Sequence, residues 1–235
     1  MTREFFSEIF TFPTLLFATA VIILFLAIHV FIWYKSTPRR NVLRLLVRNS
    51  HYMMVHEGNS DLGHYYVDLD EVLLSPDATR NIINSYSGVV DELLSKDPDV
   101  TKLAFIEGDS GPVGAVVLAG ALVDSTGLPG VIVRLRRRLV DASVKGALPI
   151  ERTDRFIVIS DVATSGAGVV EAVQKLRHLG GQVTHAVVFH DRQQYSSVDL
   201  SSATERLANL APPVRLVALS DAAGLERMHL LPRNE

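Results

Sequence analysis

The segment from Phe156 to Gly168 constrains the fold more than any other part of the sequence. It starts with four apolar residues, reaches a carboxylate at Asp161, and continues into a run of small residues. The residues after it place apolar side chains at helical spacing. A buried strand that leads through a small-residue loop into a helix is typical of a phosphate site, because backbone N–H groups and the helix dipole point at the anion. The same pattern is also compatible with an ordinary loop of a doubly wound sheet.

Alternating strand and helix patterns occupy most of the chain. Strand patterns cover residues 103–106, 130–134, 156–159, 183–189 and 214–219, and helix patterns cover residues 77–94, 113–124, 169–178 and 201–210. Residues 65–74 are predicted to be extended, and residues 41–47 to form a short amphipathic helix. Strands that alternate with helices predict an α/β fold with a doubly wound parallel sheet. Ligands of such folds bind at the carboxyl ends of the strands.

Residues 159–166, Ile-Ser-Asp-Val-Ala-Thr-Ser-Gly, resemble the diphosphosugar-binding motif of the type I phosphoribosyltransferases. That motif has two acidic residues before a Thr-Thr-Gly loop; here Ser160 replaces the first acid and Asp161 matches the second. The resemblance implies that Asp161 holds the ribose hydroxyls of phosphoribosyl pyrophosphate (PRPP), directly or through Mg²⁺. It also implies a site for the 5′-phosphate made by Thr164, Ser165, Gly166, Ala167 and Gly168. From the residues alone, Asp161 is also compatible with a helix N-cap.

Other segments resemble the orotate phosphoribosyltransferases, in the same order along the chain. Residues 63–68 look like their N-terminal block, residues 107–114 like their pyrophosphate loop, Arg134 like the arginine that opens their catalytic loop, and residues 187–193 like their later Asp-Arg strand end. The resemblance implies pyrophosphate contacts by Asp109, Ser110 and Gly111, and base contacts by Tyr66 and Arg192.

The segment that matches the catalytic loop departs from the family pattern. Leu135 replaces the first lysine, Arg138 falls at the second lysine, and Val140 at the histidine. The resemblance therefore leaves Arg134, Arg138 and Asp161 as the expected catalytic residues. Residues 136–138 are equally compatible with a solvated loop.

The resemblance therefore predicts a phosphoribosyltransferase that transfers phosphoribosyl from PRPP to an orotate-type base with Mg²⁺. Two alternatives remain open at this stage: a sensor that binds PRPP or a nucleotide without efficient turnover, and a scaffold. A homodimer is expected. The formal net charge of −3 argues against a nucleic-acid partner, and the absence of cysteine excludes thiolate chemistry.

The N-terminal segment predicts a membrane anchor. No Asp, Glu, Lys or Arg occurs from Ile9 to Tyr34, and a helical crossing needs roughly 20 apolar residues. Residues 14–34 are therefore expected to span the membrane once, and the basic flank after them predicts a cytoplasmic C-terminal domain. The rival interpretation is a cleaved signal peptide. The expected divisions are residues 1–35 as tail and transmembrane helix, 36–50 as a basic juxtamembrane segment, and 51–235 as the phosphoribosyltransferase-like domain.

Overall fold

The computed structural model describes residues 19–28, 54–55, 64–65, 73, 75–107, 113–135, 143–193, 195–196 and 199–221. The chain divides into two units, Met1–Arg40 and Asn41–Glu235. The predicted helix at 41–47 lies outside the described residues, as does most of the extended segment predicted at 65–74. The domain boundaries expected at residues 35 and 50 stay predictions.

The first unit contains a described helix at residues 19–28, whose apolar side chains are exposed. At 1.5 Å per residue this helix is about 15 Å long, roughly half the thickness of a bilayer core. Among the described residues, no helix is both long enough and apolar enough to cross a membrane. The prediction of a single-pass membrane protein with a cytoplasmic domain is therefore wrong for the described part of the chain. The remaining residues of the expected 14–34 span lie outside it.

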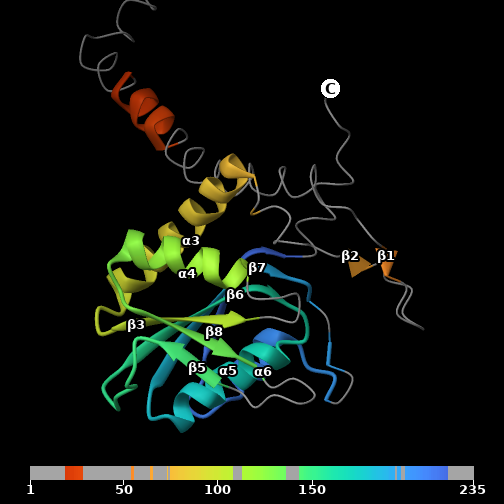
Figure 1. Cartoon of the computed structure of the whole chain (residues 1–235). Coiled ribbons are helices and arrows are strands. Elements are labelled where there is room, and N and C mark those ends of the chain that lie inside the picture. The colour runs from red at the N-terminus through yellow and green to blue at the C-terminus, as the bar shows by residue number, and fades with distance from the viewer. Residues whose placement is uncertain are drawn as a thin grey trace, which may run out of the picture. The chain divides into compact units, whose positions relative to one another are not determined.

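The second unit is built on a six-stranded sheet with the strand order β5-β4-β3-β6-β7-β8 (Figure 1). Its strands are β3 (Lys102–Glu107), β4 (Gly130–Arg134), β5 (Ser143–Gly146), β6 (Arg155–Ala163), β7 (Gln182–Asp191) and β8 (Arg215–Asp221). All neighbours pair in parallel except β4 and β5, which are antiparallel. The sequence had predicted a parallel sheet, whereas the observed sheet is mixed, because β5 is antiparallel to its neighbour. A separate antiparallel pair joins β1 (Met54–Val55) to β2 (His64–Tyr65).

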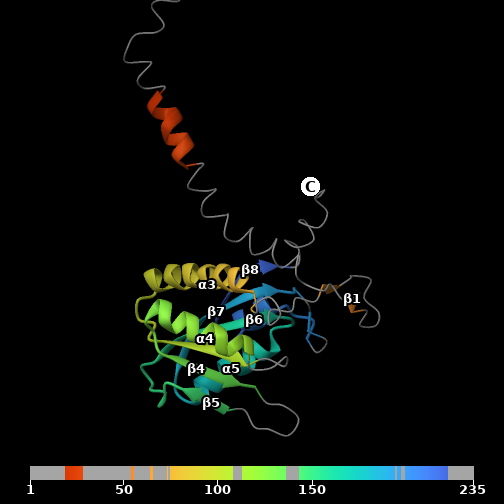
Figure 2. The same ribbon diagram turned by 45° about the horizontal axis from the view of Figure 1, so that its top comes forward.

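Helices cover both faces of the sheet (Figure 1). On one face, α3 (Pro76–Lys96) and α4 (Val113–Thr126) lie side by side (Figure 2). On the other face are α5 (Ala167–His178) and α6 (Ala203–Ala208). Two apolar clusters hold these layers together. The first contains Ile82, Tyr86, Phe105, Leu122, Ile159 and Phe189, and the second contains Ile106, Val133, Val158, Val173, Val188 and Leu207.

The strand order reverses direction between β3 and β6. From β3 the chain proceeds through α4 to β4, whereas from β6 it proceeds through α5 to β7 on the other side. The ladder between β3 and β6 ends at Phe105 and Ile159, although β3 stays paired with β4 as far as Glu107. The two central strands thus diverge at their carboxyl ends. Such a switch point is where ligands of open α/β sheets bind.

Candidate functional site

The loop after β6 presents backbone N–H groups at the start of α5. Gly166 is the N-cap residue and has a φ of 75°, a left-handed conformation that favours glycine. The first backbone bond of the helix runs from the Val170 N–H to the Gly166 carbonyl, at 2.9 Å. The N–H groups from Gly166 to Val169 are therefore not used within the helix. Their position at the positive end of the helix dipole suits a phosphate.

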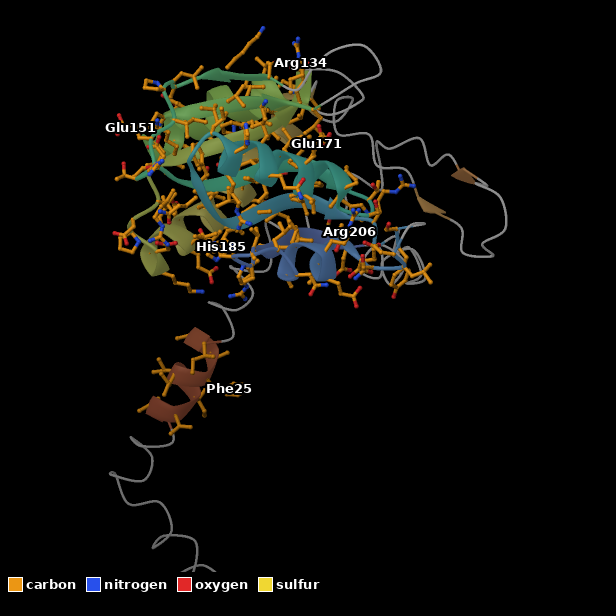
Figure 3. The ribbon with its side chains drawn as sticks, turned by 90° about the horizontal axis from the view of Figure 1, so that it is seen from below. Phe25, Arg134, Glu151, Glu171, His185 and Arg206 are labelled. Atoms are coloured by element: carbon orange, nitrogen blue, oxygen red, sulfur yellow. The ribbon has the colours of Figure 1, made fainter. Side chains whose placement is uncertain are left out.

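Helix α6 packs against this loop and fixes its shape. A Cβ atom added to Gly166 would lie 2.7 Å from the Ala203 Cα, so only glycine allows the close approach. The Arg206 Nη1 donates to the Ser165 carbonyl at 3.4 Å, and its Nε lies 3.5 Å from an Asp199 carboxylate oxygen. Figure 3 shows Arg206 projecting from α6. Sequence reasoning did not find this contact, since the two partners are 41 residues apart.

Asp161 lies within β6 rather than in the loop after it. Its Oδ1 accepts hydrogen bonds from the Val162 N–H at 2.6 Å and from the Ser160 hydroxyl at 3.2 Å. Because the N-cap of α5 is Gly166, the alternative interpretation of Asp161 as the cap is excluded. Ser160 is only 5% exposed, so this chain has a neutral hydroxyl where an acid would be a buried charge next to Asp161.

A buried tyrosine supports the end of β6. The Tyr86 hydroxyl, from α3, donates to the Ser160 carbonyl at 2.6 Å. This bond lies just beyond Ile159, where the ladder with β3 ends, so Tyr86 supplies a donor where the neighbouring strand has diverged. Burial raises the pKa of the Tyr86 hydroxyl well above its usual value, and the nearby Asp161 carboxylate raises that pKa further. The helical spacing of α3 predicts only that Tyr86 is buried, so sequence reasoning missed its polar role.

Arg134 lies at the carboxyl end of β4, where the resemblance predicts it (Figure 3). Its Nε donates to both carboxylate oxygens of Glu107, at 3.0 and 3.1 Å. The two residues are register partners in adjacent strands, which holds the pair together. Sequence reasoning placed Glu107 directly after one predicted strand and Arg134 at the end of another, but the register that pairs them is not encoded in the motifs.

The carboxyl ends of β7 and β8 form the other side of the site. The Arg192 N–H donates to the Ala163 carbonyl at 2.8 Å and so joins the end of β7 to the start of the loop that leads into α5. Burial raises the pKa of Asp191, although the Gln193 N–H donates to its Oδ1 at 2.9 Å. Burial lowers the pKa of His190 to about 4, so this imidazole is neutral in the folded protein at neutral pH.

The described part of the chain brings Arg134, Asp161, the loop from Thr164 to Gly168 and Arg192 to one edge of the sheet. The other predicted site residues lie outside the described residues: Tyr66, Asp109, Ser110, Gly111 and Arg138. No group of three or more His, Cys, Asp or Glu side chains with metal-binding geometry occurs in the residues that the structure describes.

Comparison with known proteins identifies the family. No protein-family model matches the chain. The orotate phosphoribosyltransferase of Methanopyrus kandleri is 32% identical over 164 residues, which are 69% of this chain and 82% of that protein. The enzyme of the same name from Cenarchaeum symbiosum is 31% identical over 163 residues, 68% of this chain and 78% of that protein.

Solved structures show the same fold. Orotate phosphoribosyltransferase from Aeropyrum pernix superposes with a TM-score of 0.59 at 21% identity, over 80% of this chain and 98% of that one. The Mycobacterium tuberculosis orotate phosphoribosyltransferase in complex with PRPP has a TM-score of 0.57 at 22% identity, over 80% and 99%. These sequence relatives show that the chain belongs to the orotate phosphoribosyltransferase family.

Proposed function

We propose that this protein transfers the phosphoribosyl group of PRPP to orotate or a closely related nitrogenous base. The observation that carries the proposal is the strand–carboxylate–loop–helix unit from Asp161 to Gly168, at the switch point of a chain that belongs to this family. Fold alone would not support a reaction, since one fold hosts many functions. The proposal rests instead on the site together with the sequence relatives.

The two ends of PRPP have separate binding groups in this proposal. The backbone N–H groups from Gly166 to Val169 hold the 5′-phosphate, and the hydroxyls of Thr164 and Ser165 lie in the same loop. Asp161 accepts hydrogen bonds from the ribose hydroxyls. The pyrophosphate end extends toward β3 and β4, where Arg134 lies and where residues 109–111 follow β3 along the chain. Tyr66 and Arg192 are the proposed contacts of the base.

The chemistry requires charge stabilisation more than a strong acid or base. The bond from the ribose C1 to a pyrophosphate oxygen breaks as a base nitrogen donates its electron pair to C1, and pyrophosphate leaves with the bonding electrons. The nitrogen loses its proton to solvent. Asp161 and the phosphate loop fix the ribose on either side of C1, so the base attacks in one orientation. Arg134 and Arg138 are the proposed cations at the leaving group.

A magnesium ion fits this arrangement if it arrives with the substrate. Magnesium is commonly held by one or two carboxylates together with substrate phosphates, and it keeps several of its waters. Asp161 is a described carboxylate at the switch point, and its Oδ1 is already held by Val162 and Ser160. Asp161 would hold the ion indirectly, through water or the ribose hydroxyls. When bound, magnesium would neutralise charge that develops on the departing pyrophosphate.

Calorimetric titration of the full chain with PRPP and Mg²⁺ tests the binding half of the proposal. Asp161→Asn should weaken PRPP binding by about 1–3 kcal/mol, because a charge-assisted hydrogen bond to the ribose is lost. Asp91→Asn, which neutralises an exposed carboxylate on α3, is the matched control and should leave the affinity unchanged. Equal PRPP affinity in wild type and Asp161→Asn would reject the assignment.

A further inference from the structure

The pair formed by Glu107 and Arg134 lies beside the switch point, on the side where the pyrophosphate of PRPP is proposed to bind. The Glu107 side chain is 11% exposed and that of Arg134 is 37% exposed. The ladder between β3 and β4 places the two residues opposite each other, and Nε contacts both carboxylate oxygens. The strand register therefore fixes where the two side chains start, in addition to the contacts between the side chains themselves.

Glu107 changes what Arg134 offers to an anion. A guanidinium beside a carboxylate at 3 Å presents almost no net charge at a distance, and solvent screens a buried carboxylate less than an exposed one. A pyrophosphate that approaches Arg134 is therefore attracted by the cation and repelled by Glu107. Glu107 has no role in the chemistry described above, so its charge at this position calls for a function of its own.

We propose that Glu107 weakens the affinity of this site for pyrophosphate, because its negative charge offsets the positive charge of Arg134. The proposal rests on the proposed function and concerns its second product. A lower affinity for free pyrophosphate speeds its departure after transfer. It also lowers the rate of the reverse reaction at a given pyrophosphate concentration. It also withdraws part of the cationic stabilisation from the leaving group, so transfer is slower than it would be with an unpaired arginine.

Glu107→Gln tests the proposal, because the amide keeps the shape and one oxygen acceptor for the Arg134 Nε but removes the charge. The full chain is titrated by calorimetry with pyrophosphate and Mg²⁺. Pyrophosphate should bind about tenfold more tightly to Glu107→Gln, because the repulsion by Glu107 is removed while the Arg134 cation stays. Ribose 5-phosphate is the matched ligand. Its affinity should not change, because the loop from Thr164 to Gly168 holds its phosphate.

Glu151→Gln is the matched control variant, because Glu151 is exposed and precedes β6 at the opposite edge of the sheet. It should leave pyrophosphate affinity as in wild type. If Glu107→Gln does not fold, the double variant decides: Glu107→Gln with Arg134→Gln should bind pyrophosphate more tightly than Arg134→Gln alone, in which Glu107 is left unpaired.

Unchanged or weaker pyrophosphate binding by Glu107→Gln overturns the inference. So does an equal gain for ribose 5-phosphate, or equal pyrophosphate affinity in Arg134→Gln and in the double variant. If PRPP binds to wild type while any of these results is found, only the inference about Glu107 fails. If neither PRPP nor pyrophosphate binds to wild type or to Glu107→Gln, the proposed function fails with it.

Discussion

Gly166 shows how a single residue determines the shape of the phosphate loop. Its φ of 75° is unfavourable for other residues, and an added Cβ would lie 2.7 and 2.8 Å from the Cα and Cβ of Ala203. Backbone strain and a steric clash therefore act together at this position. Either the loop or α6 must shift to accept a side chain.

Gly166→Ala is expected to lower the free energy of unfolding by about 1–3 kcal/mol and to weaken PRPP binding, because the N–H groups of the loop would be displaced. Denaturant unfolding and calorimetry measure the two effects. Gly88→Ala is the control: a Cβ there meets nothing within 4 Å, and Gly88 lies in the helix α3, so alanine should be stabilising. Wild-type PRPP affinity in Gly166→Ala would show that the loop does not hold the phosphate.

His190 is a buried residue whose protonation state follows from its partners. The Ser220 hydroxyl donates its one proton to the Phe189 carbonyl at 2.8 Å, so it accepts from the His190 Nδ1, which lies 3.0 Å away. The neutral imidazole therefore carries its proton on Nδ1. Burial lowers the pKa of His190 to about 4, an effect that Arg192 reinforces and Asp221 opposes.

This histidine predicts a component of acid sensitivity. Between the folded pKa of about 4 and the unfolded value of about 6.5, the unfolded chain binds more protons, so stability falls as the pH is lowered through this window. In His190→Asn, the change in the free energy of unfolding across this pH window should be smaller than in wild type by up to about 3 kcal/mol. In His178→Asn, at an exposed position on α5, that change should be the same as in wild type. Unfolding titrations at pH 4 to 7 measure the difference, and identical pH profiles for wild type and His190→Asn would contradict the burial argument.

At the scale of elements, the end of β6 depends on a helix that is distant in sequence. Tyr86 of α3 donates to the Ser160 carbonyl, and the next residue is Asp161. Tyr86→Phe keeps the aromatic ring, whose centre lies 6.2 Å from that of Phe189, but leaves a buried carbonyl without this donor.

Tyr86→Phe should therefore reduce stability by about 1–3 kcal/mol and also weaken PRPP binding, because the strand that carries Asp161 loses its support. Ser85→Ala is the matched control, since it removes a hydroxyl from the neighbouring position of α3 that donates within the helix, to the Asn81 carbonyl. In an Asp161→Asn background the effect of Tyr86→Phe on affinity should disappear. An affinity loss of the same size in both backgrounds would mean that Tyr86 does not act through Asp161.

Sequence patterns identified most elements but misplaced several ends. The apolar run predicted a strand at 156–159, whereas β6 continues to Ala163, because its ladder with β7 extends through polar residues that carry no strand pattern. The strand β5 was missed, since its four residues, Ser-Val-Lys-Gly, are too short and polar to show periodicity. The start of α6 was predicted near its observed position, and Ser202 and Glu205 form the capping box there.

At the scale of the whole molecule, the two edges of the sheet have different charge arrangements. At the amino-terminal edge, charges are paired for structure: Lys102 lies 2.8 Å from Asp154, and Arg155 lies 3.0 Å from Asp97. At the carboxyl-terminal edge, Arg134, Asp161 and Arg192 come from three strands or their ends and converge near the switch point. The order of the motifs predicted this convergence, because carboxyl ends of parallel strands meet at one edge. The pairing of Arg134 with Glu107 depends on register, which the motifs do not encode.

The most direct test of the account is the formation of the ribonucleotide of orotate by the full chain supplied with orotate, PRPP and Mg²⁺. Nucleotide and pyrophosphate should appear in equal amounts. Asp161→Asn should lower kcat/KM at least about tenfold, the equivalent of one charge-assisted hydrogen bond, while Asp91→Asn should not change it. Absence of nucleotide product under conditions where PRPP binds, or turnover that Asp161→Asn leaves unchanged, would contradict the account.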